Sequence, residues 1–370
     1  MTNDQLPMTN ACTAESGWGH LSLVIRLSEV KRLIPSRVLK PNADGSSRIA
    51  RRLSMRWAFG VLGVLGILLA QGAGWAGEPV AVITEIRREQ GEVRVRPAGE
   101  ADWRLPQLLL ALRPGDQVSA EGESRTVLVF TGGGAQVVSQ ANSPFTVQAP
   151  AGETGIQRLG ALVARVTTFL LGQQKDLTTY RSLSVRSTRG QVPLILSPRE
   201  TRLLAGPVTF EWAGPDRLRY SVRVLGPQGL VWGQASLPRQ TLGYPATAPA
   251  LSPGVTYTWD LEARGHPVQR AQFELLPDAE AARVQAALAL MQPATLPGYP
   301  RNTVTLMRAG LFFQERLYHD ARRELLARIK ADPDEPTLHL LLGQVYDRVG
   351  LKELAEEEFR EAQILTTRKS

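Results

Sequence analysis

The sequence predicts a multidomain fold in which two all-β regions are followed by an α-helical region. The length of 370 residues exceeds the usual size of one domain. Short alternating segments rich in β-branched and aromatic residues, separated by turn residues, occupy 77–152 and 191–277. A repeat of 34 residues follows near the C-terminus. The apolar fraction of 43% and the charged fraction of 21% are typical of globular proteins rather than disordered chains.

Residues 55–76 have the pattern of a secretory signal peptide. Several arginines, the last of which is Arg56, precede an uncharged run over 57–69, and small residues follow up to Ala76. This order predicts signal cleavage between Ala76 and Gly77, with export of everything that follows. This pattern predicts that the protein is located in the periplasm or cell envelope of a bacterium.

Two alternatives concern the same part of the chain. The segment 57–76 has about the length that a bilayer-spanning helix needs. The first alternative is therefore that it is not cleaved and anchors the protein in the membrane, and it is the only segment for which we expect membrane contact. Residues 1–54 are interpreted as an upstream tail or as a misassigned start, with translation from Met55. The only cysteine, Cys12, lies in this tail, which predicts an exported protein without disulfides.

The charge distribution argues against nucleic-acid binding. The net charge of +8 arises mainly in residues 1–76, and the remainder holds 34 Lys+Arg against 31 Asp+Glu. No basic stripe with interleaved aromatic residues occurs in this remainder. We therefore expect no nucleic-acid partner.

Residues 77–152 are expected to form the first all-β domain. Three motifs carry a resemblance to the periplasmic domain of FecR-like proteins: 91–93 (GEV), 112–116 (LRPGD) and the hairpin at 124–139. Gly132 stands where that family often has Asp. The resemblance implies an exported β-domain, and in the founding member this domain relays a signal to an intracellular sigma factor.

Three glycines at 132–134 lie between the apolar runs of that hairpin. A phosphate-binding loop of the Walker type needs Lys followed by Ser or Thr and then a helix. The residues that follow, 135–138 (AQVV), read instead as a strand. The glycines are therefore predicted to form a hairpin turn with positive φ angles.

Residues 153–190 are expected to hold one helix and a linker. The apolar stripe of this helix consists of Ile156, Leu159, Val163, Val166 and Leu170. Such a stripe is more typical of a helix that packs on protein than of one on a membrane surface.

Residues 191–277 predict a β-sandwich. Tyr257, Trp259, Leu261 and Ala263 alternate along one segment and are expected to point inward, toward Trp212. The piece LSPGVTYTWDLEA resembles strand F of fibronectin type III domains, which implies a fibronectin or immunoglobulin-like fold with Tyr257 as the corner tyrosine. Because these aromatic residues could instead bind sugars, a cell-wall glycan remains an alternative partner.

Residues 278–370 are expected to be helical, with repeats at 302–335 and 336–369. Ala309 recurs as Gly343, and the pairs Phe312 and Tyr346, Ala321 and Ala355, and Leu325 and Phe359 follow the same spacing. This pattern resembles the tetratricopeptide repeat, whose helical hairpins line a groove. The resemblance implies a groove for protein partners formed by Leu306, Phe313, Gln314, Leu340, Gln344, Asp347 and Arg348. Packing of this face on a neighbouring β-domain stays an equal alternative.

The sequence offers no catalytic, cofactor-binding or metal-binding pattern. The four histidines lack ligand spacing, and His319 and His339 are expected to be surface or packing residues. The function predicted is therefore that of an exported, non-enzymatic scaffold for protein interactions. Transmembrane signalling of the FecR type and cell-wall glycan binding are the alternatives.

Overall fold

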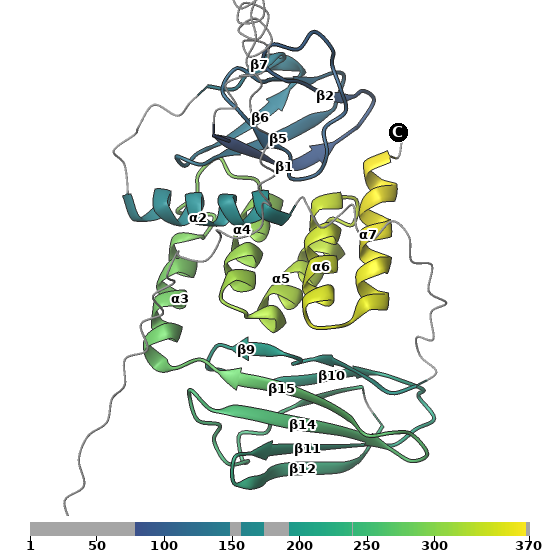
Figure 1. Cartoon of the computed structure of the whole chain (residues 1–370). Coiled ribbons are helices and arrows are strands. Elements are labelled where there is room, and N and C mark those ends of the chain that lie inside the picture. Colours follow the sequence, from purple (N-terminus) through teal and green to yellow (C-terminus); the bar gives the residue numbers. More distant parts are fainter. Residues whose placement is uncertain (1–77, 149–156, 174–191, 239, 368–370) are drawn as a thin grey trace, which may run out of the picture. The chain divides into compact units, whose positions relative to one another are not determined.

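The described part of the chain is β-rich at its start and helical at its end, as the sequence predicts (Figure 1). The computed structural model describes residues 78–148, 157–173, 192–238 and 240–367. All of them belong to one unit. The predicted cleavage position, Ala76 and Gly77, and the candidate span 57–76 lie outside the described residues.

The expectation of a transmembrane helix is corrected. Within the four described stretches, no helix combines the length and the apolar character needed to cross a membrane. The longest, α2 (Gln157–Gln173), has 17 residues. At 1.5 Å per residue it is about 25 Å long, less than the roughly 30 Å of a hydrocarbon core.

The first β region contains two antiparallel sheets. A four-stranded sheet has the order β3-β1-β5-β6, and a three-stranded sheet has the order β2-β4-β7. The strands are β1 (Ala81–Arg87), β2 (Val93–Arg96), β3 (Ala111–Leu112), β4 (Gln117–Ala120), β5 (Arg125–Phe130), β6 (Ala135–Ser139) and β7 (Phe145–Thr146), with a short 3-10 helix, η1 (Gln140–Asn142). The central strand β1 is buried over its first six residues, so the sheet is covered on both faces.

The glycine turn predicted between β5 and β6 is confirmed. These strands pair antiparallel, with Val129 opposite Ala135. Gly133 and Gly134 have φ angles of 95° and 92°, which L side chains rarely adopt. The Gly134 amide also donates a hydrogen bond of 2.7 Å to the hydroxyl oxygen of Tyr299, so the turn contacts the segment before the repeat helices.

The second β region consists of two sheets around an aromatic core. One sheet has the order β13-β10-β8, and the other has the order β12-β11-β14-β15-β9. The strands are β8 (Leu194–Ser197), β9 (Thr201–Leu203), β10 (Thr209–Ala213), β11 (Tyr220–Gly226), β12 (Gly229–Leu237), β13 (Thr241–Gly243), β14 (Thr256–Ala263) and β15 (Gln269–Leu275). The inward orientation predicted for Tyr257, Trp259, Leu261 and Ala263 is confirmed, because all four are buried in one core with Trp212.

Five helices follow, and the last four stack in sequence. They are α3 (Asp278–Leu290), α4 (Arg301–Gln314), α5 (Tyr318–Ala331), α6 (Pro336–Arg348) and α7 (Lys352–Thr367). In each of the hairpins α4-α5 and α6-α7, the residues that recur after 34 positions are buried. Small residues bring the helices together: a Cβ at Gly343 would lie only 2.6 Å from Cε1 of Phe359.

The helices and the first β region share one continuous apolar core, whereas the second β region has a core of its own. Helix α2 belongs to the shared core and contacts β1, β5 and α4. Its predicted apolar positions Val163, Val166 and Leu170 are buried, whereas Ile156 lies outside the described residues. Strand β1 also contacts α4 and α6.

Candidate functional site

The residues expected to line a groove are mostly covered by the protein's own chain. Leu306 and Leu340 are fully buried, and Phe313 and Gln344 are 5% and 4% exposed. Gln314 and Asp347 are half-buried, and Arg348 is exposed. The structure therefore brings the seven residues onto two adjacent helices, α4 and α6, but leaves only three of them in reach of solvent.

Helix α2 packs against α4. The rings of Phe169 and Phe313 lie 5.1 Å apart, and Nε2 of Gln314 donates a hydrogen bond of 3.1 Å to the backbone oxygen of Arg165. Gly310 leaves room for Val166, since an added Cβ would lie 2.9 Å from its Cγ1. Helix α4 thus packs against an amphipathic helix of the same chain.

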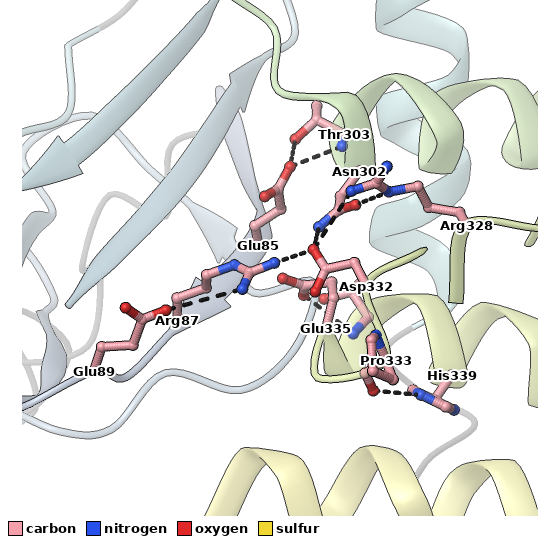
Figure 2. Close-up of polar contacts among 11 residues, drawn as sticks. Glu85, Arg87, Glu89, Asn302, Thr303, Arg328, Asp332, Pro333, Glu335 and His339 are labelled. Carbon is pink, nitrogen blue, oxygen red and sulfur yellow. Dashed lines mark hydrogen bonds and ion pairs between the residues drawn. The ribbon is translucent and has the colours of Figure 1, made fainter. Parts of the chain in front are cut away.

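Strand β1 contacts the N-terminus of α4 and supplies the capping group that the residues before α4 lack (Figure 2). Helix α4 begins after Pro300, whose side chain caps nothing. The backbone N–H of Thr303 donates instead to Oε1 of Glu85 at 2.8 Å, and the Thr303 hydroxyl donates to the same oxygen. First-turn N–H groups have no acceptor within their helix, so Glu85 satisfies a group that would otherwise be unpaired.

A second carboxyl group, that of Glu335, caps α6. Its Oε1 accepts a hydrogen bond of 3.3 Å from the backbone N–H of Thr337, and Oε2 has no partner among the described residues. The side chain is fully buried. Burial, and after it the Glu85 carboxylate, raise the pKa of Glu335 to about 8. Glu335 is therefore mainly protonated at pH 7 in the folded protein.

The positively charged side chains near Glu85 and Glu335 pair with a third acid, Asp332. Its Oδ2 accepts hydrogen bonds from Nη2 of Arg87 and, at 2.7 Å, from Nδ2 of Asn302. Nη2 of Arg328 lies 3.6 Å from the same oxygen, and Nε of Arg328 donates to Asn302. Figure 2 shows Glu85 on one side of this ion pair and Glu335 on the other.

Burial decides what this carboxyl pair can do. A carboxyl group with a raised pKa beside a second acid is an arrangement that acid–base catalysis uses. Glu85 and Glu335 are 5% and 0% exposed, so no substrate reaches either group in this conformation. The pair can, however, bind a proton where the first β region contacts the repeat helices. Burial also raises the pKa of Glu85, against the hydrogen bonds from Thr303.

The second β region contacts the repeat helices through a different set of polar groups. Oγ of Ser197 and Nδ1 of His319 lie 2.7 Å apart, and Nη1 of Arg322 donates to Oε2 of Glu211 at 2.7 Å. A serine hydrogen-bonded to a histidine can be a nucleophile with its base. Here Ser197 and His319 are 2% and 8% exposed, which makes the pair a packing contact. Burial lowers the pKa of His319 to about 4.

The comparisons with known proteins give no family for the chain. No protein-family model matches it, and no curated protein matches it. Among the residues that the structure describes, no group of three or more His, Cys, Asp or Glu side chains is arranged to hold a metal ion.

Sequence reasoning missed Glu85, Glu335 and the contact between Ser197 and His319. For His319 itself the sequence predicts a surface or packing position, and the residue is buried in packing. His339 is 8% exposed and contacts Oε2 of Glu358 at 2.7 Å. For Glu335, one signal was available: a Glu-Pro pair before an apolar run is a helix start with Pro at its first position.

Proposed function

We propose that the protein is an exported, non-enzymatic scaffold of the bacterial cell envelope that binds other proteins through its repeat helices. One observation carries the proposal: the inner face of α4 already holds an amphipathic helix, α2, through ring packing and a side-chain hydrogen bond. A surface that binds one such helix within the chain has the chemistry to bind a helix of a partner.

The finer fold assignments belong to the same proposal. The 34-residue spacing of buried small and large residues supports a pair of tetratricopeptide hairpins. The Tyr257 hydroxyl accepts a hydrogen bond of 2.8 Å from the backbone N–H of Ser252, which is the geometry of a tyrosine corner and supports a fibronectin or immunoglobulin-like sandwich. The glycine turn between β5 and β6 supports the FecR-like assignment of the first β region.

Proximity labelling of the full chain in living cells tests the scaffold function. Phe169→Ala removes the ring that packs on Phe313 and is expected to loosen α2 from α4. The surface of α4 would then be free, and labelling of partners that bind it through a helix should increase. Thr168→Ala is the matched control, because Thr168 is the exposed residue directly before Phe169 in the same helix. If wild type and both variants label only the neighbours of an unrelated exported protein, the scaffold proposal is wrong.

Two cheaper measurements test the remaining parts of the proposal. N-terminal sequencing of the mature protein should give Gly77, and an intact Met1 would contradict processed export. Sedimentation with purified peptidoglycan tests the glycan alternative. Because Trp212, Tyr257 and Trp259 are core residues, we expect no co-sedimentation. Co-sedimentation would favour glycan binding over the protein scaffold.

A further inference from the structure

The contact between the first β region and the repeat helices contains more acids than its cations can neutralise. Three carboxyl groups inside the contact, those of Glu85, Asp332 and Glu335, face two guanidinium groups, those of Arg87 and Arg328. At the exposed edge, Nη1 of Arg87 also lies 3.9 Å from Oε1 of Glu89. Both guanidinium groups approach the same oxygen of Asp332. The groups inside the contact therefore carry an excess of negative charge unless at least one of the two remaining acids keeps a proton.

The geometry indicates which acid keeps it. Glu85 accepts two hydrogen bonds from Thr303 at the start of α4, an arrangement that favours its charged form. Glu335 accepts one, and its second oxygen is buried without a partner among the described residues. A buried oxygen with no donor is far less costly on a neutral acid than on a carboxylate. The proton therefore belongs on Glu335.

The cluster joins parts of the chain that are far apart in sequence. Glu85 and Arg87 lie on β1, whereas Thr303, Asp332 and Glu335 lie on α4 and in the turn before α6. The contact has no disulfide, because the chain's one cysteine is at position 12. Its polar part includes these hydrogen bonds and ion pairs and the contact of the Thr84 and Thr303 hydroxyl oxygens at 3.1 Å.

We propose that Glu85 and Glu335 form a proton-dependent latch, which holds strand β1 on the first turns of α4 and α6 while Glu335 is protonated and loosens when it ionises. If Glu335 ionised, the buried contact would hold the carboxylates of both Glu85 and Glu335, and Oε2 of Glu335 would have no hydrogen-bond donor. The guanidinium groups of Arg87 and Arg328 already pair with Asp332. Opening of the contact relieves this by hydrating both groups.

The sign of the pH dependence follows from the same groups. When the contact is open, Glu335 is solvated and titrates near 4.5; when it is closed, the pKa is about 8. The closed form thus holds one proton more between these values, and the ratio of closed to open contact falls about tenfold per pH unit from roughly pH 5 to pH 8.

The titratable and charged groups around Glu335 come from five places: Glu85 and Arg87 of β1, Arg328 of α5, Asp332 and Asp334 of the turn, His339 of α6 and Glu358 of α7. His339 needs a control, because burial lowers its pKa but the hydrogen bond to Glu358 and other neighbours raise it overall. A histidine with a raised pKa also loses stabilisation as the pH rises.

Hydrogen exchange of the full chain at pH 5, 6, 7 and 8, with labelling times scaled for the intrinsic pH dependence, tests the latch. Protection of the amides in 81–87, 301–306 and 337–341 should fall about tenfold per pH unit, while that of β14 in the second β region serves as the internal reference. Glu335→Gln keeps a neutral cap of the same shape and should abolish the response. Glu123→Gln, on an exposed turn, and His339→Gln should retain it.

Any one of three results would overturn the latch. The first is wild-type protection in these segments that does not change with pH relative to β14. The second is a Glu335→Gln variant that keeps the wild-type response, and the third is a His339→Gln variant that loses it. If Glu335→Gln fails to fold, Glu85→Gln gives the second reading: it removes the facing charge and should reduce the response by the same logic, and an unchanged response contradicts the proposal.

Discussion

Gly343→Ala should destabilise the repeat helices, although alanine is the better helix former. Gly343 lies inside α6, where an added Cβ would be 2.6 Å from Cε1 of Phe359, 2.7 Å from its Cδ1 and 3.2 Å from the backbone oxygen of Ala355. The ring of Phe359 is buried and the third atom is backbone, so neither can simply swing away. Helices α6 and α7 must move apart.

The magnitude follows from two opposing effects. Replacing glycine by alanine in a helix interior gains about 1 kcal/mol. Overpacking of a filled core costs about 1–3 kcal/mol, and a contact as short as 2.6 Å lies toward the upper end. We therefore expect the free energy of unfolding to fall by about 1–2 kcal/mol. The repeat spacing alone would not indicate this, because the matching position in the first hairpin is Ala309.

Gly172→Ala is the matched control. Gly172 lies in α2, it is exposed, and an added Cβ would meet nothing within 4 Å. The same substitution should there raise the free energy of unfolding, by up to about 1 kcal/mol. Urea denaturation of the full chain, followed by far-UV circular dichroism, measures both variants against wild type. If Gly343→Ala stabilises the protein as much as Gly172→Ala does, the packing argument is refuted.

Three further predictions concern other parts of the chain. His319→Gln should make the protein less sensitive to acid. Between pH 7 and pH 5, wild type should lose roughly 1–3 kcal/mol of unfolding free energy relative to this variant, because His319 gains a proton mainly in the unfolded chain; urea midpoints at both pH values measure the difference. Trp259→Phe should cost about 1–3 kcal/mol by thermal denaturation, because the buried Nε1 donates to the backbone oxygen of Pro198 at 2.7 Å. Gly134→Val should cost about 1–3 kcal/mol in the same assay, because φ is 92° there.

Those elements of the fold that rest on local patterns could be predicted from the sequence. The β5-β6 hairpin follows from glycines between two apolar runs, and the inward face of β14 follows from strict alternation. The helical hairpins follow from buried residues that recur after 34 positions. Each pattern depends on residues close together in the chain, whose spacing is set by the geometry of one strand, turn or helix.

The cover of the inner helical face could not be predicted in the same way. The family resemblance implies a groove lined by residues that include Leu306, Phe313 and Leu340, and these three residues lie on α4 and α6. What covers these helices depends on which distant segment presents a matching apolar stripe. An uncovered face with these side chains would expose a large apolar patch, which is a reason to search the chain for an internal occupant. The stripe at 163–170 was such a segment.

The polar contact of β1 with α4 shows which kind of signal can reveal a distant partner. Helix α6 begins with its own carboxyl cap, Glu335, whereas α4 begins at Arg301 after Pro300, which is not a capping residue. A helix whose first turn is buried and has no local acceptor must receive one from elsewhere. That acceptor, Glu85, lies 218 positions away from Thr303, so no spacing rule could find it. The missing cap itself is readable in the sequence, and it restricts the search to side chains whose oxygen can accept a hydrogen bond from a backbone N–H.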